Sequence, residues 1–202
     1  MVAIKKRDFV EISYAGRIKE DNSIFDKSEK SVVCIGESFM LKELEEQMVG
    51  KEAGKEYKFE IGSGKAFGQK DTKLIRLIPM GKFRQQNIQP FPGLQLNIDG
   101  IFGIVKTVSG GRCLVDFNHP LAGKDLIYDV KVKRVLEDSK EKLDSLIVAR
   151  FNIKDAQIEL NEGSAAIKLK QSLPNHAQDE FKKIAANLVP EIKLIDFATI
   201  NK

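Results

Sequence analysis

The sequence contains few of the residues that bind metals or form disulfide bonds. Among its 202 residues, two are cysteines and two are histidines. Their spacing matches no zinc site, which argues against a structural metal. Cys34 and Cys113 lie far apart in apolar, strand-like runs, which favours two buried thiols because free cysteine is usually buried. A disulfide or a metal pair is the alternative.

Long hydrophobic runs are also absent. No stretch reaches the roughly 18 apolar residues that a membrane-spanning helix needs, so we expect no membrane partner. Residues 1–14 have no apolar signal-peptide core and turn directly into strand-like alternation. They predict a cytoplasmic protein.

The net charge of the chain is only +4, and it is unevenly placed. Residues 72–119 contain six basic and two acidic side chains, and therefore carry the whole surplus. Such a segment is typical of an RNA- or ribosome-binding surface, or of a solvated β-rich module. No run of aromatic residues accompanies the bases for stacking on a nucleic acid, which argues against a nucleic-acid partner.

One helix is predicted in the first third of the chain. Leu41, Leu44 and Met48 recur at helical spacing. Ser38 precedes them as a candidate N-cap, and Gly50 follows as a residue that ends a helix in the left-handed conformation. The flanking residues alternate between apolar and polar, as strands do.

Four short strands follow within residues 74–117. Asp99-Gly100 and Gly110-Gly111 are hairpin turn signals between the last three of them. We therefore predict a compact all-β unit in this part of the chain.

The pattern changes after Leu136. A helical stretch with Ser139 as its candidate cap precedes a predicted hairpin, a second helix that begins near Pro174, and a closing hydrophobic strand. Residues 138–202 are therefore predicted to form an α+β domain.

Four motifs stand in order along residues 8–136: "YAGRIKEDNSIFDKS", "GESFMLKELEEQMVGKEAGKEY", "KAFGQKD" and "VDFNHPLAGKDLIYDVKV". Together they resemble the FKBP-type peptidyl-prolyl cis/trans isomerases, in particular the SlyD-like branch and its long archaeal members. The resemblance implies an α+β fold: an antiparallel sheet wrapped on a short helix, an all-β insert-in-flap domain and a C-terminal α+β domain. The implied bounds are 1–72 with 118–137 for the isomerase, 73–117 for the insert and 138–202 for the C-terminal domain.

The activity that the resemblance implies is rotation about X-Pro bonds during protein folding. This rotation crosses a barrier of roughly 18–20 kcal/mol. No covalent bond changes, so we expect no nucleophile, metal or cofactor. An apolar pocket disfavours the planar, polarised amide relative to the twisted one, and a few donors hold the carbonyl.

The family's pocket positions fall on a mainly apolar set of residues. The resemblance implies that Tyr14, Phe25 and Tyr128 form aromatic walls of the pocket. Met40 and Leu41 are implied at the start of the helix, and Leu44 as the floor of the pocket. Asp26 is implied to orient Tyr14 or to lie beside the amide, and Phe67 to lie in the flap. The backbone of Met40 is implied as a substrate contact. An ordinary core role is the alternative for each residue.

Three residues depart from the family pattern. Glu43 stands where glycine is frequent, Phe67 where tyrosine is common, and Leu44 replaces the tryptophan of the small eukaryotic members. These departures put the rate in question, so a catalytically weak holdase with the same fold is an alternative. The histidine-rich tail of some bacterial relatives is absent, and we expect no nickel role.

His119 lies where the resemblance places the return of the chain from the insert to the isomerase domain. Because the reaction transfers no proton, an acid or base is not needed. We therefore predict a structural, hydrogen-bonding role for His119 and not a catalytic one.

In the family, such inserts bind unfolded chains. Exposed apolar side chains with flexible methionine suit promiscuous binding, and the candidates here are Met80, Phe83, Ile88 and Phe91. The alternative is that Phe83 and Phe91 close the small core of the insert. The expected partners are therefore unfolded or proline-containing polypeptides.

A second copy of the chain is a further expected partner. The closing strand of residues 138–202 is hydrophobic, and an unpaired strand edge favours pairing with another chain. We therefore predict a homodimer through this domain. A monomeric appendage that only extends the binding surface is the alternative.

Overall fold

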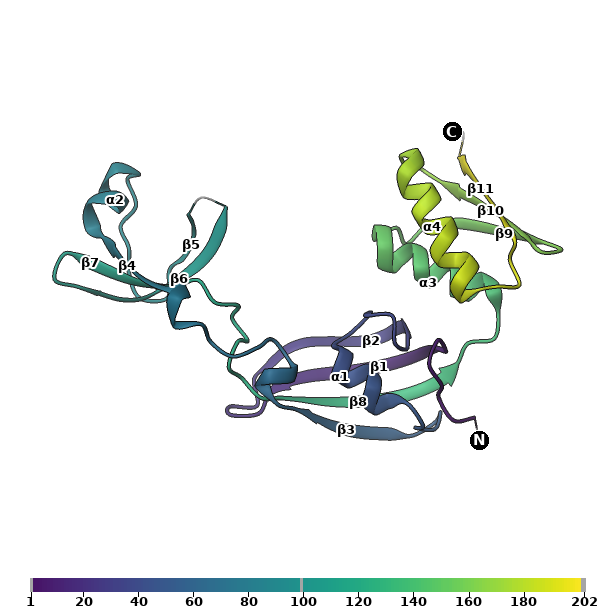
Figure 1. The fold of residues 1–202 in the computed structure, drawn as a ribbon, viewed down its shortest axis with the longest axis horizontal. Helices are drawn as coiled ribbons and strands as arrows, with labels where there is room; N and C mark the ends of the chain where they lie inside the picture. The colour runs from purple at the N-terminus through teal and green to yellow at the C-terminus, as the bar shows by residue number, and fades with distance from the viewer. Residues whose placement is uncertain (1, 99, 201–202) are drawn as a thin grey trace. The chain divides into compact units, whose positions relative to one another are not determined.

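The computed structural model describes residues 2–98 and 100–200, which form two compact units (Figure 1). The first unit contains the residues up to Arg17, Ile24–Phe59 and the residues from Tyr128 onward. The second contains Ile18–Ser23 and Glu60–Ile127. The three-part division predicted from the sequence remains a prediction.

A four-stranded sheet with the order β2-β1-β8-β3 forms the body of the isomerase region. Its strands are β1 (Phe9–Ile18), β2 (Ile24–Cys34), β3 (Glu56–Ile61) and β8 (Leu126–Val135). β1 and β2 pair antiparallel, with a bulge between Ile12 and Tyr14. β2 is an edge strand, so one of its sides faces no neighbouring strand in the described part of the chain.

Helix α1 (Lys42–Met48) buries its apolar face completely, since Leu44 and Met48 are 0% exposed. Figure 1 shows it lying along the sheet. The helix ends before Gly50, whose φ of +81° is the predicted left-handed stop. The predicted start is wrong, because α1 begins after Leu41 and Ser38 caps nothing.

The second unit contains a sheet of order β4-β7-β6-β5, in which neighbouring strands are antiparallel. The strands are β4 (Ile75–Pro79), β5 (Gln95–Ile98), β6 (Ile101–Ser109) and β7 (Arg112–Asp116). Gly110 and Gly111 have positive φ and form the predicted turn. Ile98 pairs with Ile101 in the other predicted hairpin, and Asp99 lies outside the described residues.

The unit is not all-β as predicted, because a short helix, α2 (Met80–Gln85), follows β4. Phe83 on this helix is 2% exposed and packs into the core of the unit. Burial of one aromatic side chain therefore stabilises a helical turn between two of the predicted strands. Two 3-10 turns, Ser63–Lys65 and Thr72–Leu74, precede β4.

The C-terminal residues of the first unit form a three-stranded sheet of order β11-β10-β9 with two helices (Figure 1). The elements are α3 (Ser139–Phe151), β9 (Gln157–Asn161), β10 (Ser164–Leu169), α4 (Asn175–Leu188) and β11 (Leu194–Thr199). The predicted hairpin is confirmed as the antiparallel pair β9–β10, and β11 runs parallel to β10.

The predicted cap of α3 is wrong by one residue. The carboxylate of Asp138, and not the hydroxyl of Ser139, accepts the N–H of Glu141 at 2.8 Å. The core around α3 and α4 also includes Phe9, Cys34 and Leu136, so the body of the first unit continues into its C-terminal part. Within residues 2–98 and 100–200, none of the helices has the length and hydropathy to cross a membrane.

Candidate active site

Three aromatic side chains and one carboxylate gather on strands β1, β2 and β8. The hydroxyl of Tyr14 donates a hydrogen bond to Asp26 Oδ2 at 2.9 Å. The ring of Tyr128 lies 6.1 Å from that of Tyr14 and 5.7 Å from that of Phe25, centre to centre, the latter edge to face. Edge-to-face pairs are favoured by the charge distribution of the rings. Four of the eight predicted pocket residues therefore lie together.

Gly16 makes this clustering sterically possible. A Cβ atom at this position would stand 2.8 Å from Cζ of Phe25 and 3.0 Å from Cε1 of Tyr128. The first distance is shorter than real Cβ atoms show, and the second is tighter than nine in ten real Cβ contacts. The two rings therefore occupy the space that any larger residue at position 16 would need.

Both tyrosines remain protonated over the physiological pH range. Burial, the hydrogen bond to Asp26 and the charge of Asp26 hold the pKa of Tyr14 well above its ordinary value. Burial and the charge of Asp26 raise the pKa of Tyr128 to about 12. Each hydroxyl therefore keeps its proton and is unsuited to proton transfer, and the proton of Tyr14 is donated to Asp26.

The loop before α1 carries Met40 and Leu41, both half-buried, and is held by a residue that the sequence analysis missed. Glu45 is 1% exposed, and its carboxylate accepts three backbone N–H groups, from Gly36 at 2.8 Å, Ser38 at 3.2 Å and Met40 at 2.7 Å. This clamp satisfies donors that a side-chain cap would otherwise take, which explains why Ser38 is not the cap. It also fixes the backbone of Met40.

Phe67 belongs to the second unit, so its membership of the pocket stays a prediction. Its ring stacks on the imidazole of His119, with centroids 4.4 Å apart and planes 4° apart. His119 is exposed, and its Nδ1 accepts the N–H of Leu121 at 3.2 Å. Both contacts lie within the second unit, and the structural role predicted for His119 stays a prediction.

Asn118, beside it, joins the two chain segments that lead into and out of the β4–β7 sheet. Its Oδ1 accepts the N–H of Asp71 at 2.8 Å, and its Nδ2 donates to the carbonyl of Asp71 at 3.0 Å. The side-chain amide thus pairs with Asp71 as a neighbouring strand would. Asp116 is 6% exposed, and its carboxylate accepts three hydrogen bonds. Two come from Nδ2 and the backbone N–H of Asn118, and the third comes from Nζ of Lys70.

These hydrogen bonds determine the ionisation of Asp116. Burial by itself raises the pKa of this carboxyl group. The hydrogen bonds from Asn118 and the charge and hydrogen bond of Lys70 more than offset burial, and the pKa is lowered from its ordinary value. Asp116 is therefore charged, and it binds both Asn118 and Lys70 where the chain enters and leaves the β4–β7 sheet.

Of the four apolar residues predicted in the insert, only Phe91 is largely exposed, at 57%. Phe83 lies in the core, as the alternative predicted, and Met80 and Ile88 pack partly against it. The sequence analysis missed three other exposed apolar side chains of this unit, which are Leu77, Ile101 and Phe102.

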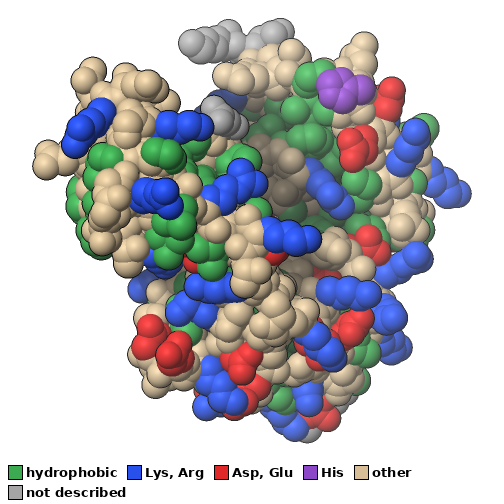
Figure 2. Space-filling view, turned by 60° about the vertical axis from the view of Figure 1, so that its left-hand side comes forward, with side chains coloured by type: hydrophobic (Ala, Val, Ile, Leu, Met, Phe, Trp, Pro, Cys, Tyr) green, Lys and Arg blue, Asp and Glu red, His purple; other side chains and the backbone are tan. Residues whose placement is uncertain are grey.

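Leu77 and Ile101 line a groove of about 280 Å³, together with Phe117 and the basic residues Arg76 and Lys82. Figure 2 shows hydrophobic side chains beside lysine and arginine on this unit. The groove therefore offers apolar contacts with cations at its margin.

Known proteins of one family resemble this chain in sequence. The family described as "FKBP26, IF domain" matches residues 76–121. A probable FKBP-type 16 kDa peptidyl-prolyl cis-trans isomerase of Pseudomonas fluorescens is 30% identical over 131 residues, which cover 61% of this chain and 85% of that protein. The chain belongs to the FKBP-type peptidyl-prolyl cis-trans isomerases.

Two further relatives of this FKBP-type isomerase support the assignment. A short-type peptidyl-prolyl cis-trans isomerase of Methanocaldococcus jannaschii is 29% identical, over 65% of this chain and 94% of that protein. The isomerase SlyD of Escherichia coli is 28% identical, over 66% and 71%.

A solved structure, of a multi-domain immunophilin from Arabidopsis thaliana, is 14% identical and matches with a TM-score of 0.37. The match covers 75% of this chain and 47% of that one, and it is too loose to bear on the fold.

Proposed function

We propose that this isomerase accelerates rotation about X-Pro bonds in folding polypeptides and that its insert holds unfolded segments of them. The observation that carries the first part is the cluster of Tyr14, Phe25 and Tyr128 with Asp26. Rings favour the less polar, twisted amide, and the hydroxyl of Tyr128 is a donor for a carbonyl, whereas that of Tyr14 is donated to Asp26. The raised pKa values of both tyrosines match a reaction without proton transfer.

Glu43 and Phe67 give no reason to replace catalysis by a holdase role alone. Glu43 lies in the first turn of α1, where an acidic residue suits the helix dipole and costs less helix stability than glycine. Phe67 lacks a hydroxyl and is paired with an imidazole. We propose that these two residues adjust the rate and leave the reaction unchanged.

The chaperone role of the insert rests on its exposed apolar side chains. Phe102 is 74% exposed, and Leu77 and Ile101 border the groove described above. Large apolar side chains exposed together are typical of binding surfaces. The basic margin adds attraction for acidic segments, and we propose unfolded polypeptides as the ligands.

The isomerase assignment is tested with two matched hydroxyl deletions. Tyr14→Phe removes the donor to Asp26, whereas Tyr57→Phe removes a hydroxyl that bonds only the backbone of Glu52 in the same sheet. Cis-to-trans rates of a tetrapeptide X-Pro substrate should fall several-fold for Tyr14→Phe and remain near wild type for Tyr57→Phe. Equal isomerisation rates for the two variants would contradict the assignment of Tyr14 to the catalytic pocket.

We also propose a homodimer through the C-terminal sheet. β11 is an edge strand, and Leu194 at its start is 67% exposed. Unpaired edges with apolar side chains favour pairing with another chain. Light scattering should give twice the chain mass for the wild type and the monomer mass for Leu194→Lys. A wild type that remains monomeric at high micromolar concentration rules the dimer out.

A further inference from the structure

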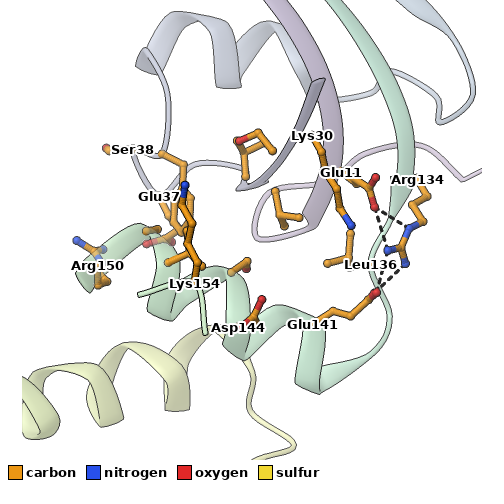
Figure 3. A pocket seen from close by; sticks show the side chains of 17 residues that line it. Glu11, Lys30, Glu37, Ser38, Arg134, Leu136, Glu141, Asp144, Arg150 and Lys154 are labelled. Carbon is orange, nitrogen blue, oxygen red and sulfur yellow. Dashed lines mark hydrogen bonds and ion pairs between the residues drawn. The ribbon is translucent and has the colours of Figure 1, made fainter. Parts of the chain in front are cut away.

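A cleft of about 680 Å³ opens in the first unit, between the edge strand β2 and helix α3 (Figure 3). This volume lies within the range of ligand pockets, about 300–1,000 Å³. One wall contains four consecutive residues of β2, Lys30 to Val33. The other wall is α3, which lies in the same compact unit and shares its core.

The backbone of β2 is available on the cleft side. The N–H of Ile35 donates to Asp8 at 3.0 Å, and in the same register Val33 pairs with Val10. Hydrogen-bonded pairs alternate along an antiparallel ladder. The intervening Val32 therefore turns its N–H and C=O away from β1, and no described residue forms a hydrogen bond with either group.

One face of α3 looks into the cleft. Its lining residues recur at helical spacing, and they are Glu141, Asp144, Ser145, Val148 and Ala149. Phe39, Leu136 and Val148 supply apolar surface. A groove between an edge strand and a helix is the geometry in which extended peptides add a strand to a sheet, with backbone bonds giving affinity and side chains specificity.

The charges in the cleft favour one class of ligand. Arg134 is already occupied, because it forms ion pairs with Glu11 at 2.9 Å and Glu141 at 2.7 Å (Figure 3). In the described part of the chain, the other lining cations form no ion pair, and these are Lys30, Arg150 and Lys154. The lining carboxylates that form no ion pair there are Glu37 and Asp144. Lys133, which does not line the cleft, lies 3.7 Å from Glu11, so that Arg134 and Lys133 together balance Glu11 and Glu141. The remaining lining charges are three cations against two carboxylates.

We propose that this cleft is a second polypeptide-binding site, in which an extended segment with apolar and acidic side chains adds a strand along β2. The backbone of the segment pairs with Val32. Its apolar side chains contact Phe39 and Val148, and its carboxylates meet Lys30, Arg150 and Lys154. Pairing through the backbone accepts many sequences.

The inference deepens the proposed chaperone function and rests on it for the nature of the ligand. It uses neither the aromatic cluster nor the insert. A proline-free peptide therefore tests the cleft without reporting on isomerisation, and the insert variant Phe102→Ser separates any contribution of the insert.

The experiment is a fluorescence anisotropy titration of the full-length chain. The probe is a fluorescein-labelled peptide of about eight residues, in which valine alternates with glutamate and which spans about 26 Å as a strand. Val32→Pro removes the outward N–H at an edge position that tolerates proline, and Val32→Ala keeps it. Ala149→Trp fills the cleft from an exposed position, and Lys140→Trp adds the same side chain to α3 outside the lining.

Val32→Pro and Ala149→Trp should each weaken binding by about tenfold, the effect of about 1.4 kcal/mol. Val32→Ala and Lys140→Trp should remain within about twofold of wild type. Because Ala149→Trp deletes no buried group, it reports on the cleft even if Val32→Pro fails to fold. Wild-type affinity in Ala149→Trp overturns the proposal.

Two outcomes identify other binding modes. If Phe102→Ser loses affinity for the peptide and Ala149→Trp keeps it, the peptide binds at the insert. This outcome overturns the proposal of a second site. A chain mass that doubles in the wild type but not in Val32→Pro makes a second copy the occupant of the edge, and also overturns it.

Discussion

Asp116 stabilises the two chain segments that connect the β4–β7 sheet to the rest of its unit. Its negative charge contributes to this stabilisation. It accepts hydrogen bonds from Asn118 and Lys70 in a nearly buried position. A carboxylate with several charge-assisted hydrogen bonds is stabilised in its ionised form. Protonation therefore removes stability from the fold.

The first prediction concerns pH. The pKa of Asp116 is lower in the folded chain than in the unfolded one, so its stabilisation is present above the unfolded pKa of about 3.9. That stabilisation is lost as the pH falls through the lower, folded pKa. Between about pH 6 and about pH 2, the free energy of unfolding measured with urea should fall more for the wild type than for Asp116→Asn. Equal losses would contradict the assigned role.

The second prediction concerns the Glu45 clamp. Glu45→Gln replaces one acceptor oxygen by an NH₂ group that faces backbone donors. Because Met40 is fixed by this carboxylate, tetrapeptide isomerisation should fall several-fold, and the free energy of unfolding should fall by about 1–3 kcal/mol. The control is Glu46→Gln, on the exposed side of the same helix. If both variants keep wild-type rates, the clamp does not position the pocket.

The helices and strands divide into those that a local pattern predicts and those that depend on distant contacts. The hairpin at Gly110-Gly111, the hairpin β9–β10 and the amphipathic α4 follow from local patterns alone, and the structure confirms them. The short α2 depends on burial of Phe83, which no local pattern reveals. The start of α1 depends on Glu45, which accepts N–H groups as far back as Gly36.

The candidate site shows the same division. Tyr14, Phe25, Asp26 and Tyr128 were available from ordered motifs, and the structure places them together. The resemblance placed the return of the chain from the insert at Asn118 and His119, but it did not predict that Asn118 pairs with Asp71, which stands 47 residues earlier. The exposed residues Leu77, Ile101 and Phe102 follow only from sheet register, since alternation alone does not say which face of a strand meets solvent.

The third prediction treats the second sheet as a separable binding element. β4 to β7 lie inside residues 73–117, which a short loop can replace. The aromatic cluster lies in the other unit, so tetrapeptide isomerisation should remain within about twofold, whereas proline-limited refolding of an unfolded protein should slow by about tenfold or more. The two assays on one preparation give the answer. An equal fall in both would make the sheet part of the pocket.

For the whole protein, we propose that apolar walls carry catalysis and that surfaces outside them bind clients. Under this proposal, a client held by the same chain has a higher effective concentration of its X-Pro bonds for the pocket than a free client has. This division requires that the aromatic cluster catalyses rotation about the X-Pro bond and that no side chain acts as an acid or a base. His119 is the one side chain in the described motifs that a proton-transfer mechanism would select.

The most direct measurement is therefore kcat/KM for a tetrapeptide X-Pro substrate in Tyr128→Ala and His119→Ala, with folding of each variant checked by circular dichroism and urea unfolding. Tyr128 is 4% exposed and contacts both Tyr14 and Phe25, so its truncation should lower kcat/KM several-fold or more in a folded chain. His119→Ala should lower the free energy of unfolding and leave kcat/KM near wild type, with a flat profile from about pH 6 to about pH 9, because neither tyrosine titrates there. A large loss of kcat/KM in a fully folded His119→Ala, with Tyr128→Ala unaffected, would contradict the account.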